Sequence, residues 1–219
     1  MAEVVRWDWV ERHADDIVRH SVEHLQLVGA SLALAVAVAL PLAIAVRNRR
    51  APYVAVNALA GALYTVPSLA MFAFLLALVG IGFQPAVIAL ALYSLQMIIR
   101  NAVVGLRGVP APVREAARGM GLTPWQTLVR VELPLALPAI MAGVRLAAVS
   151  TVGIATIAVY IGGGGLGVLI VNDGIQRALF TTPIIVGAVV ATVMAIAIDL
   201  LLVGLERVLT PWQRARRAA

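Results

Sequence analysis

Residues 25–46 read LQLVGASLALAVAVALPLAIAV, a stretch without a single charged side chain. A helix needs about 20 mostly apolar residues to cross the hydrocarbon core of a bilayer. Lipid offers no partner to a backbone N–H or C=O, so a chain at this depth forms a helix or a closed barrel. Barrel strands would alternate apolar and polar residues over about 10 positions, and this stretch does not. It therefore predicts a transmembrane helix.

Four further apolar stretches follow along the chain: Tyr53–Val79, Pro85–Leu106, Leu135–Ile161 and Pro183–Leu205. The 219 residues are 62% hydrophobic and only 13% charged, and the mean hydropathy is +0.96. Soluble domains are near half apolar and about a quarter charged. The composition excludes an ordinary soluble domain and predicts an all-α membrane protein with five transmembrane helices.

The positions of the arginines and the absence of cysteine limit the kinds of partner and site that this chain can have. The formal net charge is +6, but the Arg residues stand at the ends of the apolar stretches and not along one polar face. We therefore expect no nucleic-acid partner. The chain has no Cys, which removes disulfides, thiol nucleophiles and thiolate metal sites. We expect no catalytic residue and no metal site.

The distribution of Arg predicts the orientation, because cytoplasmic loops carry more basic residues than loops on the other side. Arginines are frequent after the first stretch, between the third and fourth, and after the fifth: Arg47, Arg49, Arg50, Arg107, Arg114, Arg118, Arg130, Arg207, Arg214, Arg216 and Arg217. This places the N-terminus outside the cell and the C-terminus in the cytoplasm. Residues 1–24 are an extracytoplasmic segment, either an amphipathic interfacial helix or a frayed tail. Residues 207–219 form a basic cytoplasmic tail.

The loop at residues 107–134 lies on the predicted cytoplasmic side, and long structured loops are usually functional. Its residues 113–120 favour a helix, which Gly121 can end in a left-handed turn. Thr123 is a good N-cap for a second helix, with Pro124 at the first helical position. The loop thus predicts two short helices joined by a glycine turn.

Two further features of this loop concern its end and its surface. The Leu133–Pro134 pair is expected to break the second helix before the chain re-enters the membrane. The small side chains of Ala116 and Ala117 would let another protein surface approach closely.

Several residues of the loop stand at a set spacing: Glu115, Ala116, Ala117, Gly121, Val131, Leu133 and Pro134. The pattern resembles the EAA motif of the permeases of ATP-binding-cassette (ABC) importers, a MetI-like family. It departs from that motif at Val131, where Ile is typical. An ordinary interfacial helical hairpin is the alternative interpretation.

The resemblance implies a five-span, MetI-like permease core over residues 25–206, in a bacterial cell membrane. Its loop would be the coupling helix that docks on a separate cytoplasmic ATP-binding subunit. The chain has no Lys and so no phosphate-binding Gly-x-x-x-x-Gly-Lys-Ser/Thr loop. ATP and Mg²⁺ would be bound by the partner, while this chain binds no cofactor and is not an enzyme. A second permease copy, identical or paralogous, and an extracytoplasmic substrate-binding protein are also implied.

Three other stretches point to a substrate class: residues 64–74 (YTVPSLAMFAF), 93–101 (YSLQMIIRN) and 160–167 (YIGGGGLG). They look like the permeases for glycine betaine, carnitine and choline, and so imply a small osmoprotectant. Gln96–Met97 departs from the Leu-Pro that this family usually has, which makes a kink in the third span less expected. Importers of methionine or other amino acids share the loop and the core and are the nearest alternative. An ion-coupled secondary transporter and a non-transporting anchor are more distant ones.

Local features mark candidate moving parts. Pro67 in mid-span removes a backbone hydrogen bond, which predicts either a pathway-lining kink or a packing kink without substrate contact. The run Gly162–Gly165 predicts an outer gate or a tight re-entrant turn. Charges within spans are usually functional or paired, so we expect Arg145 and Asp199 to pair or to line a cytoplasmic vestibule, and Arg100 to snorkel or to line the pathway. The candidate pathway and gate residues are Tyr64, Thr65, Pro67, Ser68, Tyr93, Arg100, Asn101, Arg145, Gly164, Gly165 and Asp199.

The aromatic residues bear on recognition of the solute. A quaternary ammonium group binds best in an aromatic cage. The aromatic residues of the spans are few and show no cluster in the sequence. We therefore expect tight recognition by the separate binding protein and a weak, transient path through this chain.

Overall fold

The computed structural model describes residues 5–212, and within this range every regular element is a helix. The all-α prediction is confirmed. The α-helices are α1 (Trp7–Arg12), α2 (Ala14–Val46), α3 (Arg50–Thr65), α4 (Ser68–Val79), α5 (Phe83–Arg107), α6 (Ala111–Gly119), α7 (Pro124–Thr127), α8 (Leu133–Ala155) and α9 (Thr181–Leu209). Three irregular segments complete the order: a π-helical turn at Leu128–Glu132, a 3₁₀-helix at Thr156–Ile161 and a π-helix at Val168–Ile175.

The predicted spans correspond to five helical units. α2, α5 and α9 are each long and apolar enough to cross a bilayer, as is the continuous helical run Pro124–Ile161 that contains α8. The fifth unit is the bent pair of α3 and α4. The described residues therefore hold four single spans, and up to five when the bent pair counts as one.

α2 begins well before the apolar stretch that predicts it. It runs unbroken from Ala14, so the charged residues ahead of Leu25 extend the first span by about three turns. Trp9 of α1 is only 7% exposed; its ring stacks on His13 and meets Phe180 edge-on. Residues 7–24 of the predicted extracytoplasmic segment are thus mostly helical, and α1 packs on the chain itself.

The second predicted span, Tyr53–Val79, is broken near Pro67 into two helices. α3 ends at Thr65, and α4 leaves it at an angle of 98°. Pro67 has no N–H, and a residue that precedes a proline is pushed out of the α region. Val66 is accordingly extended, with φ −62° and ψ 129°.

The prediction that Leu133–Pro134 breaks the helix is wrong. α7 continues through the π-helical turn into α8, as part of one 38-residue helical run. In a regular α-helix the ring of Pro134 would clash with the carbonyl of Arg130. The π-helical turn just before the proline is wider than an α-helical turn and moves the preceding carbonyls away from the ring. The helix can therefore continue past Pro134.

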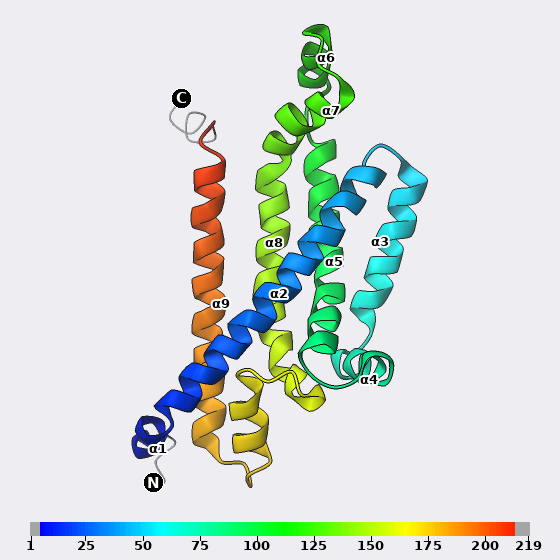
Figure 1. The fold of residues 1–219 in the computed structure, drawn as a ribbon. Coiled ribbons are helices and arrows are strands. Elements are labelled where there is room, and N and C mark those ends of the chain that lie inside the picture. Colours follow the sequence, from blue (N-terminus) through cyan, green and yellow to red (C-terminus); the bar gives the residue numbers. More distant parts are fainter. Residues whose placement is uncertain (1–4, 213–219) are drawn as a thin grey trace.

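α5 is the centre of the bundle and packs against α2 and α8 (Figure 1). Small residues allow the close approach of α5 and α8. A Cβ at Gly105 would lie 2.8 Å from the Cβ of Ala139, and a Cβ at Gly143 would lie 2.7 Å from that of Asn101. α9 stands at the edge of the bundle and leaves most of its apolar surface exposed, as a lipid-facing helix would.

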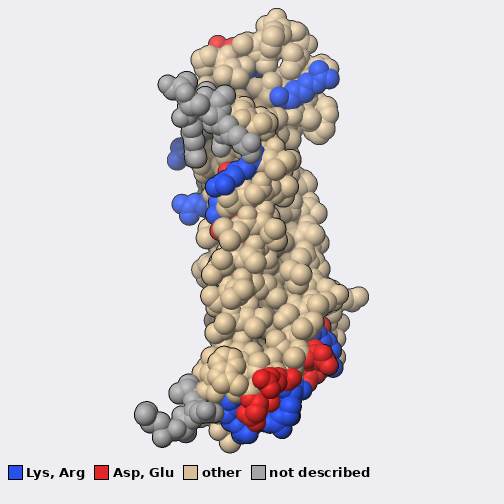
Figure 2. Space-filling model, turned by 90° about the vertical axis from the view of Figure 1, so that its left-hand side faces the viewer, with Lys and Arg blue, Asp and Glu red and all other residues tan. Residues whose placement is uncertain are grey.

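The two ends of the bundle carry different elements. α1, α4 and residues 156–180 gather at one end, called here the N-terminal end; α6, α7 and the C-terminal end of α9 lie at the other, called the loop end (Figure 1). On the face drawn in Figure 2, a broad belt without charged residues separates the two ends. This arrangement agrees with an odd number of spans. Residues 213–219 of the predicted basic tail lie outside the described residues.

Candidate functional site

The loop that the sequence singles out forms a helical hairpin at the loop end. α6 ends in a Schellman turn, in which the N–H of Leu122 donates to the Ala117 carbonyl at 3.2 Å. The N–H of Gly121 donates to the Arg118 carbonyl at 2.9 Å. Gly121 has φ +81°, a conformation that costs free energy for any residue with a Cβ. The predicted helix end at Gly121 is confirmed.

α7 begins with a capping box. The Thr123 hydroxyl accepts the N–H of Gln126 at 3.3 Å, and the Gln126 side-chain oxygen accepts the N–H of Thr123 at 2.9 Å. Pro124 takes the first helical position. The predicted cap is confirmed, with Gln126 as its reciprocal partner. Because every partner lies within five residues, the hairpin is shaped by its own sequence.

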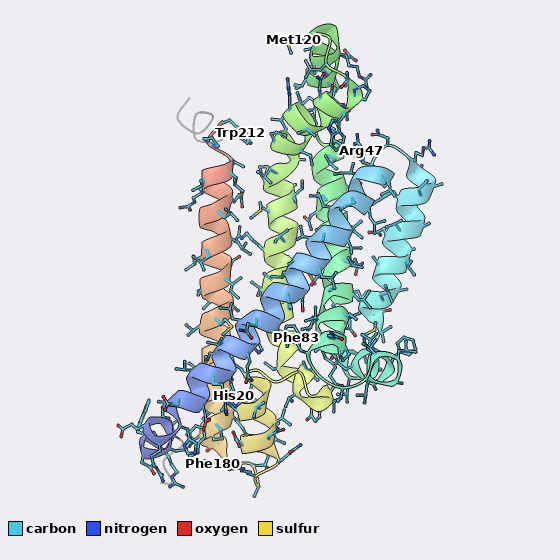
Figure 3. The ribbon with its side chains drawn as sticks, in the orientation of Figure 1. His20, Arg47, Phe83, Met120, Phe180 and Trp212 are labelled. Carbon is cyan, nitrogen blue, oxygen red and sulfur yellow. The ribbon has the colours of Figure 1, made fainter. Side chains whose placement is uncertain are left out.

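The tip of the hairpin exposes apolar side chains. Met120 is 73% and Trp125 68% exposed, and Figure 3 shows Met120 at the very tip. Glu115 and Ala116 are also exposed. Ala117, however, is only 1% exposed, so the expectation that it presents a surface to another protein is wrong. It packs inside the hairpin, where the Schellman turn folds back on it.

A buried ion pair joins the hairpin to the bundle. Arg47 Nε donates to a Glu132 carboxylate oxygen at 3.2 Å, and these side chains are only 17% and 10% exposed. Arg47 follows the C-terminal end of α2, below the hairpin in Figure 3, and Glu132 closes the π turn between α7 and α8. Arg107 lies over the ring of Tyr53 at 4.5 Å and donates to the Arg47 carbonyl at 2.8 Å. The ends of α2, α3 and α5 therefore meet the hairpin at one point.

Sequence reasoning missed this ion pair. Glu132 falls at an unspecified position of the loop motif. Arg47 entered the sequence analysis only as one of the arginines that predict the orientation of the chain in the membrane. The available signal was a carboxylate at the edge of an apolar stretch, since a buried charge needs an opposite charge. The identity of its partner, 85 residues away, had no local signal.

The bend between α3 and α4 brings two predicted tyrosines together. The Tyr93 hydroxyl donates to the Val66 carbonyl at 2.7 Å, and its ring meets Tyr64 edge-on with centroids 6.2 Å apart. Tyr64 is 41% exposed, and the Thr65 hydroxyl donates to the Ala62 carbonyl at 2.8 Å. The expectation that the aromatic residues do not cluster is corrected for this pair, which antiparallel packing of α3 and α5 places in register.

A polar line continues from the tyrosines along α3 and α5. A Cβ on Gly61 of α3 would lie 3.2 Å from the side-chain amide nitrogen of Gln96 of α5. This contact and the tyrosine pair together define the antiparallel register of α3 and α5. In the same register, Asn57 of α3 lies at the same depth along the bundle as Arg100 of α5. The side-chain oxygen of Asn57 is buried without a hydrogen-bond partner among the described residues, whereas Arg100 is exposed. Polar groups inside a span usually face the interior of a bundle or a water-filled cavity.

The other predicted polar residues pair within the chain. Arg145 of α8 holds Asp199 of α9 through two hydrogen bonds of 2.8 and 3.0 Å, so the predicted pairing is confirmed. Glu206 lies 3.9 Å from the same guanidinium. Asn101 donates to the Met97 carbonyl of its own helix at 2.8 Å.

The glycine run forms a tight re-entrant turn at the N-terminal end. Three of its residues have φ between +71° and +76°: Gly162, Gly164 and Gly165. The N–H of Gly165 donates to the Glu23 carboxylate at 3.1 Å. The N–H of Leu166 donates to Nδ1 of His24 at 3.3 Å. In this conformation the run is a packed turn, and gating requires it to leave these partners.

These features define the class of protein. A bundle with up to five membrane-crossing helices, a capped hairpin at one end and a re-entrant turn at the other is that of a polytopic membrane protein. Within residues 5–212, no three His, Asp or Glu side chains are placed to hold a metal ion. Residues 32–215 match the family described as the binding-protein-dependent transport system inner membrane component, and the chain belongs to that family. It is a permease component of an ABC importer and not an enzyme.

Several characterised relatives are similar over most of the chain. A carnitine transport permease protein, OpuCB of Listeria monocytogenes, is 46% identical over 74% of each chain. A glycine betaine/carnitine/choline transport system permease protein, OpuCB of Bacillus subtilis, is 38% identical over 93% of each chain. An osmoprotectant import permease protein, OsmW of Salmonella typhimurium, is 41% identical over 86% of this chain and 89% of its own.

Solved structures share the fold. A chain from the inward-facing MetNI methionine ABC transporter superposes with a TM-score of 0.80 at 24% identity, over 91% of this chain and 99% of its own. A second crystal form of MetNI gives 0.76 at 25% identity, over 89% and 96%. The MetI-like core implied by the loop motif is thereby confirmed.

Proposed function

We propose that this chain forms the membrane pathway of an importer for a small osmoprotectant such as glycine betaine, carnitine or choline. The supporting observation is a capped, exposed hairpin of the EAA type in a chain whose relatives, at 38–46% identity, carry the names of these solutes. The chain would work with a cytoplasmic ATP-binding subunit, an extracytoplasmic substrate-binding protein and a second permease copy, identical or paralogous.

The hairpin is the docking element for the ATP-binding subunit. Its tip carries Met120 and Trp125, both more than two-thirds exposed, beside the exposed Glu115. An apolar tip with a nearby carboxylate suits a groove on another protein. The loop end is then cytoplasmic, as the Arg distribution predicts. ATP and Mg²⁺ bind to the partner, and its closure shifts the spans from inward-facing to outward-facing populations.

The solute crosses beside the polar line on α3 and α5. Tyr64, Asn57 and Arg100 mark this line, and an arginine in a span is too costly to face lipid far from the interface. The line therefore faces the second permease copy across a water-filled path. Two tyrosines make no complete aromatic cage, so tight recognition belongs to the binding protein. Tight, saturable binding of glycine betaine to the purified chain alone would contradict this.

The test is uptake by the complete importer in proteoliposomes. Radiolabelled glycine betaine should enter only with ATP, the ATP-binding subunit and the binding protein present, and unlabelled carnitine or choline should compete. Uptake that follows an imposed ion gradient without ATP would show a secondary transporter instead.

An amino-acid importer is the second candidate, since the fold superposes on a methionine transporter and, with a TM-score of 0.74, on an amino-acid ABC transporter. Methionine and histidine added as competitors in the same assay distinguish the two. Competition by methionine or histidine but not by choline or carnitine would favour the amino-acid importer.

A further inference from the structure

α2 touches a functional element at each end of the bundle. Arg47, at its C-terminal end, pairs with Glu132 below the hairpin. Glu23 and His24, near its start, hold the glycine turn. The two contact points are about 36 Å apart along the helix axis at roughly 1.5 Å per residue, which exceeds the thickness of the bilayer core. Figure 1 shows α2 crossing the bundle obliquely between these ends.

The contact at the loop end is rigid. Both Arg47 and Glu132 are largely buried, and the guanidinium also donates to the Ile44 carbonyl at 2.6 Å. A buried, hydrogen-bonded ion pair cannot be broken without leaving charge uncompensated. Movement of the hairpin is therefore transmitted to the end of α2 and not absorbed at the joint.

The contact at the N-terminal end depends on a change of helix type. At Thr156 the chain passes from α-helix to 3₁₀-helix, and the Thr156 N–H turns to Gly153 and away from Val152. His24 Nε2 donates to the Val152 carbonyl at 3.1 Å. Because its Nδ1 accepts the Leu166 N–H, the imidazole is neutral with the proton on Nε2. One fully buried side chain thus bridges the start and the tip of the re-entrant segment.

Glu23 completes this contact. One of its carboxylate oxygens accepts both the Gly165 N–H at 3.1 Å and Nδ1 of His20 at 2.9 Å. Neighbouring residues on α2 therefore bind neighbouring backbone N–H groups of the turn. A shift of α2 along its axis must either carry the turn with it or break both hydrogen bonds.

The middle of α2 suits a sliding movement. Between residues 31 and 43 its fully buried positions recur every four residues and are small: Ser31, Ala35, Ala39 and Ala43. Small side chains allow close packing without interlocking, and packed helices commonly move by shear.

We propose that α2 is the mechanical link between the coupling hairpin and the re-entrant turn. Arg47 and Glu132 are positioning residues at one joint, and Glu23 and His24 at the other. The link rests on the proposed function, because the ATP-binding subunit supplies the movement. When that subunit closes, α2 shifts and the turn leaves its closed position.

The test uses a single reporter cysteine, since the chain has none of its own. Val171→Cys places a thiol of similar volume in the π-helix that follows the turn, at a residue only 5% exposed. A membrane-impermeant maleimide is applied to the assembled importer, without nucleotide and with ATP plus vanadate. The labelling rate should differ about fivefold or more between the two states, as expected for coupled sites.

Variants at the two joints separate the link from general damage. Arg47→Met keeps the aliphatic stem and removes the guanidinium, and the milder Glu132→Gln keeps the shape and removes the charge. In both variants the rate of maleimide labelling without nucleotide should stay unchanged. Most of the change in labelling rate on addition of ATP plus vanadate should be lost. His24→Ala should instead raise the labelling rate without nucleotide. His24→Asn keeps an acceptor near the position of Nδ1, so its labelling rate should lie closer to that of the unmodified chain. Arg12→Met is the matched control, since Arg12 is exposed and its hydrogen bonds to described residues go to Asp8 of α1.

The outcomes decide between the link and the proposed function. Full vanadate responses in both Arg47→Met and Glu132→Gln, with the ATP-binding subunit still bound, would refute the link alone. An equal loss in Arg12→Met would refute it too, because the effect would then be unspecific. Failure of the unmodified chain to bind any ATP-binding subunit would refute the proposed function, and the link with it.

Discussion

The hairpin of α6 and α7 and the re-entrant turn are both short reversals of the chain at opposite ends of the bundle, but they are built differently. The hairpin is capped by residues within five positions of one another and exposes its apolar tip. The turn is held by side chains 142 residues away and buries Gly165 and Leu166. A locally built element keeps its shape while it moves as a lever. An element built by distant contacts changes state when those contacts move.

The largest effect is expected at the hairpin turn. Gly121→Pro cannot adopt φ +81° because the ring fixes φ near −65°, and Glu115→Arg reverses an exposed charge on α6. Each variant should insert normally and abolish ATP-driven uptake in proteoliposomes. Gly119→Ala, at a site with nothing within 4 Å of an added Cβ, is the control and should transport normally. Normal uptake by both hairpin variants would defeat the coupling assignment.

The next effect concerns the joint that ties the hairpin to α2. Arg47→Met leaves the Glu132 carboxylate buried without a counter-charge, which should cost about 3 kcal/mol, or roughly 6–12 °C in Tm. Asp199→Asn keeps an acceptor for the Arg145 guanidinium, and the Glu206 carboxylate lies 3.9 Å from that guanidinium as a second counter-charge, so this change should cost only about 1 kcal/mol. Thermal unfolding in detergent compares the two. Equal shifts in Tm would mean that the remaining Glu206 carboxylate does not compensate the charge of Arg145.

A pair of alanine substitutions contrasts the two turns directly. Gly121→Ala and Gly165→Ala carry the same strain, since their φ angles are +81° and +76°, and this should cost about 1 kcal/mol. At Gly165 the new Cβ would also lie 2.9 Å from His24 Nδ1, whereas Gly121 has open space. Gly165→Ala should therefore cost roughly 2–4 kcal/mol in all, because His24 has to move. Equal Tm values for the two variants would show that the turn is not packed on α2.

The smallest effect is expected at the hairpin cap. Thr123→Ala removes the acceptor for the Gln126 N–H and should destabilise α7 by about 1 kcal/mol. Because the hairpin is self-contained, this change should speed hydrogen exchange at the start of α7 and leave the global Tm unchanged. Thr123→Ser keeps the hydroxyl and serves as the control. A fall in Tm with Thr123→Ala would mean that the hairpin and the bundle unfold together.

Features that depend on neighbouring residues were predictable. The length and apolarity of the five stretches determine that they cross a membrane, and the glycine turn and Thr123 cap follow from residues a few positions apart. The Arg145–Asp199 pair was also foreseeable, since two opposite charges in apolar helices have strong reason to meet. The loop motif was sufficient to indicate the family.

Features that depend on which helices pack together were not predictable. A kink at Pro67 was predictable, but its size of 98°, the continuation of the helix past Pro134 and the pairing of Tyr64 with Tyr93 each rest on the space that neighbouring elements leave. Ala117 has the same side chain as Ala116, yet only Ala117 is buried, because the turn that follows folds over it.

The amino-acid sequence by itself determined that this chain lies in a membrane, and that one of its loops is a capped hairpin, because hydropathy and helix capping are short-range properties. Tertiary structure alone decided that α2 reaches both the hairpin and the re-entrant turn. Hydrogen bonds across 85 and 142 residues have no local pattern, and uniformly apolar helices do not reveal which faces meet.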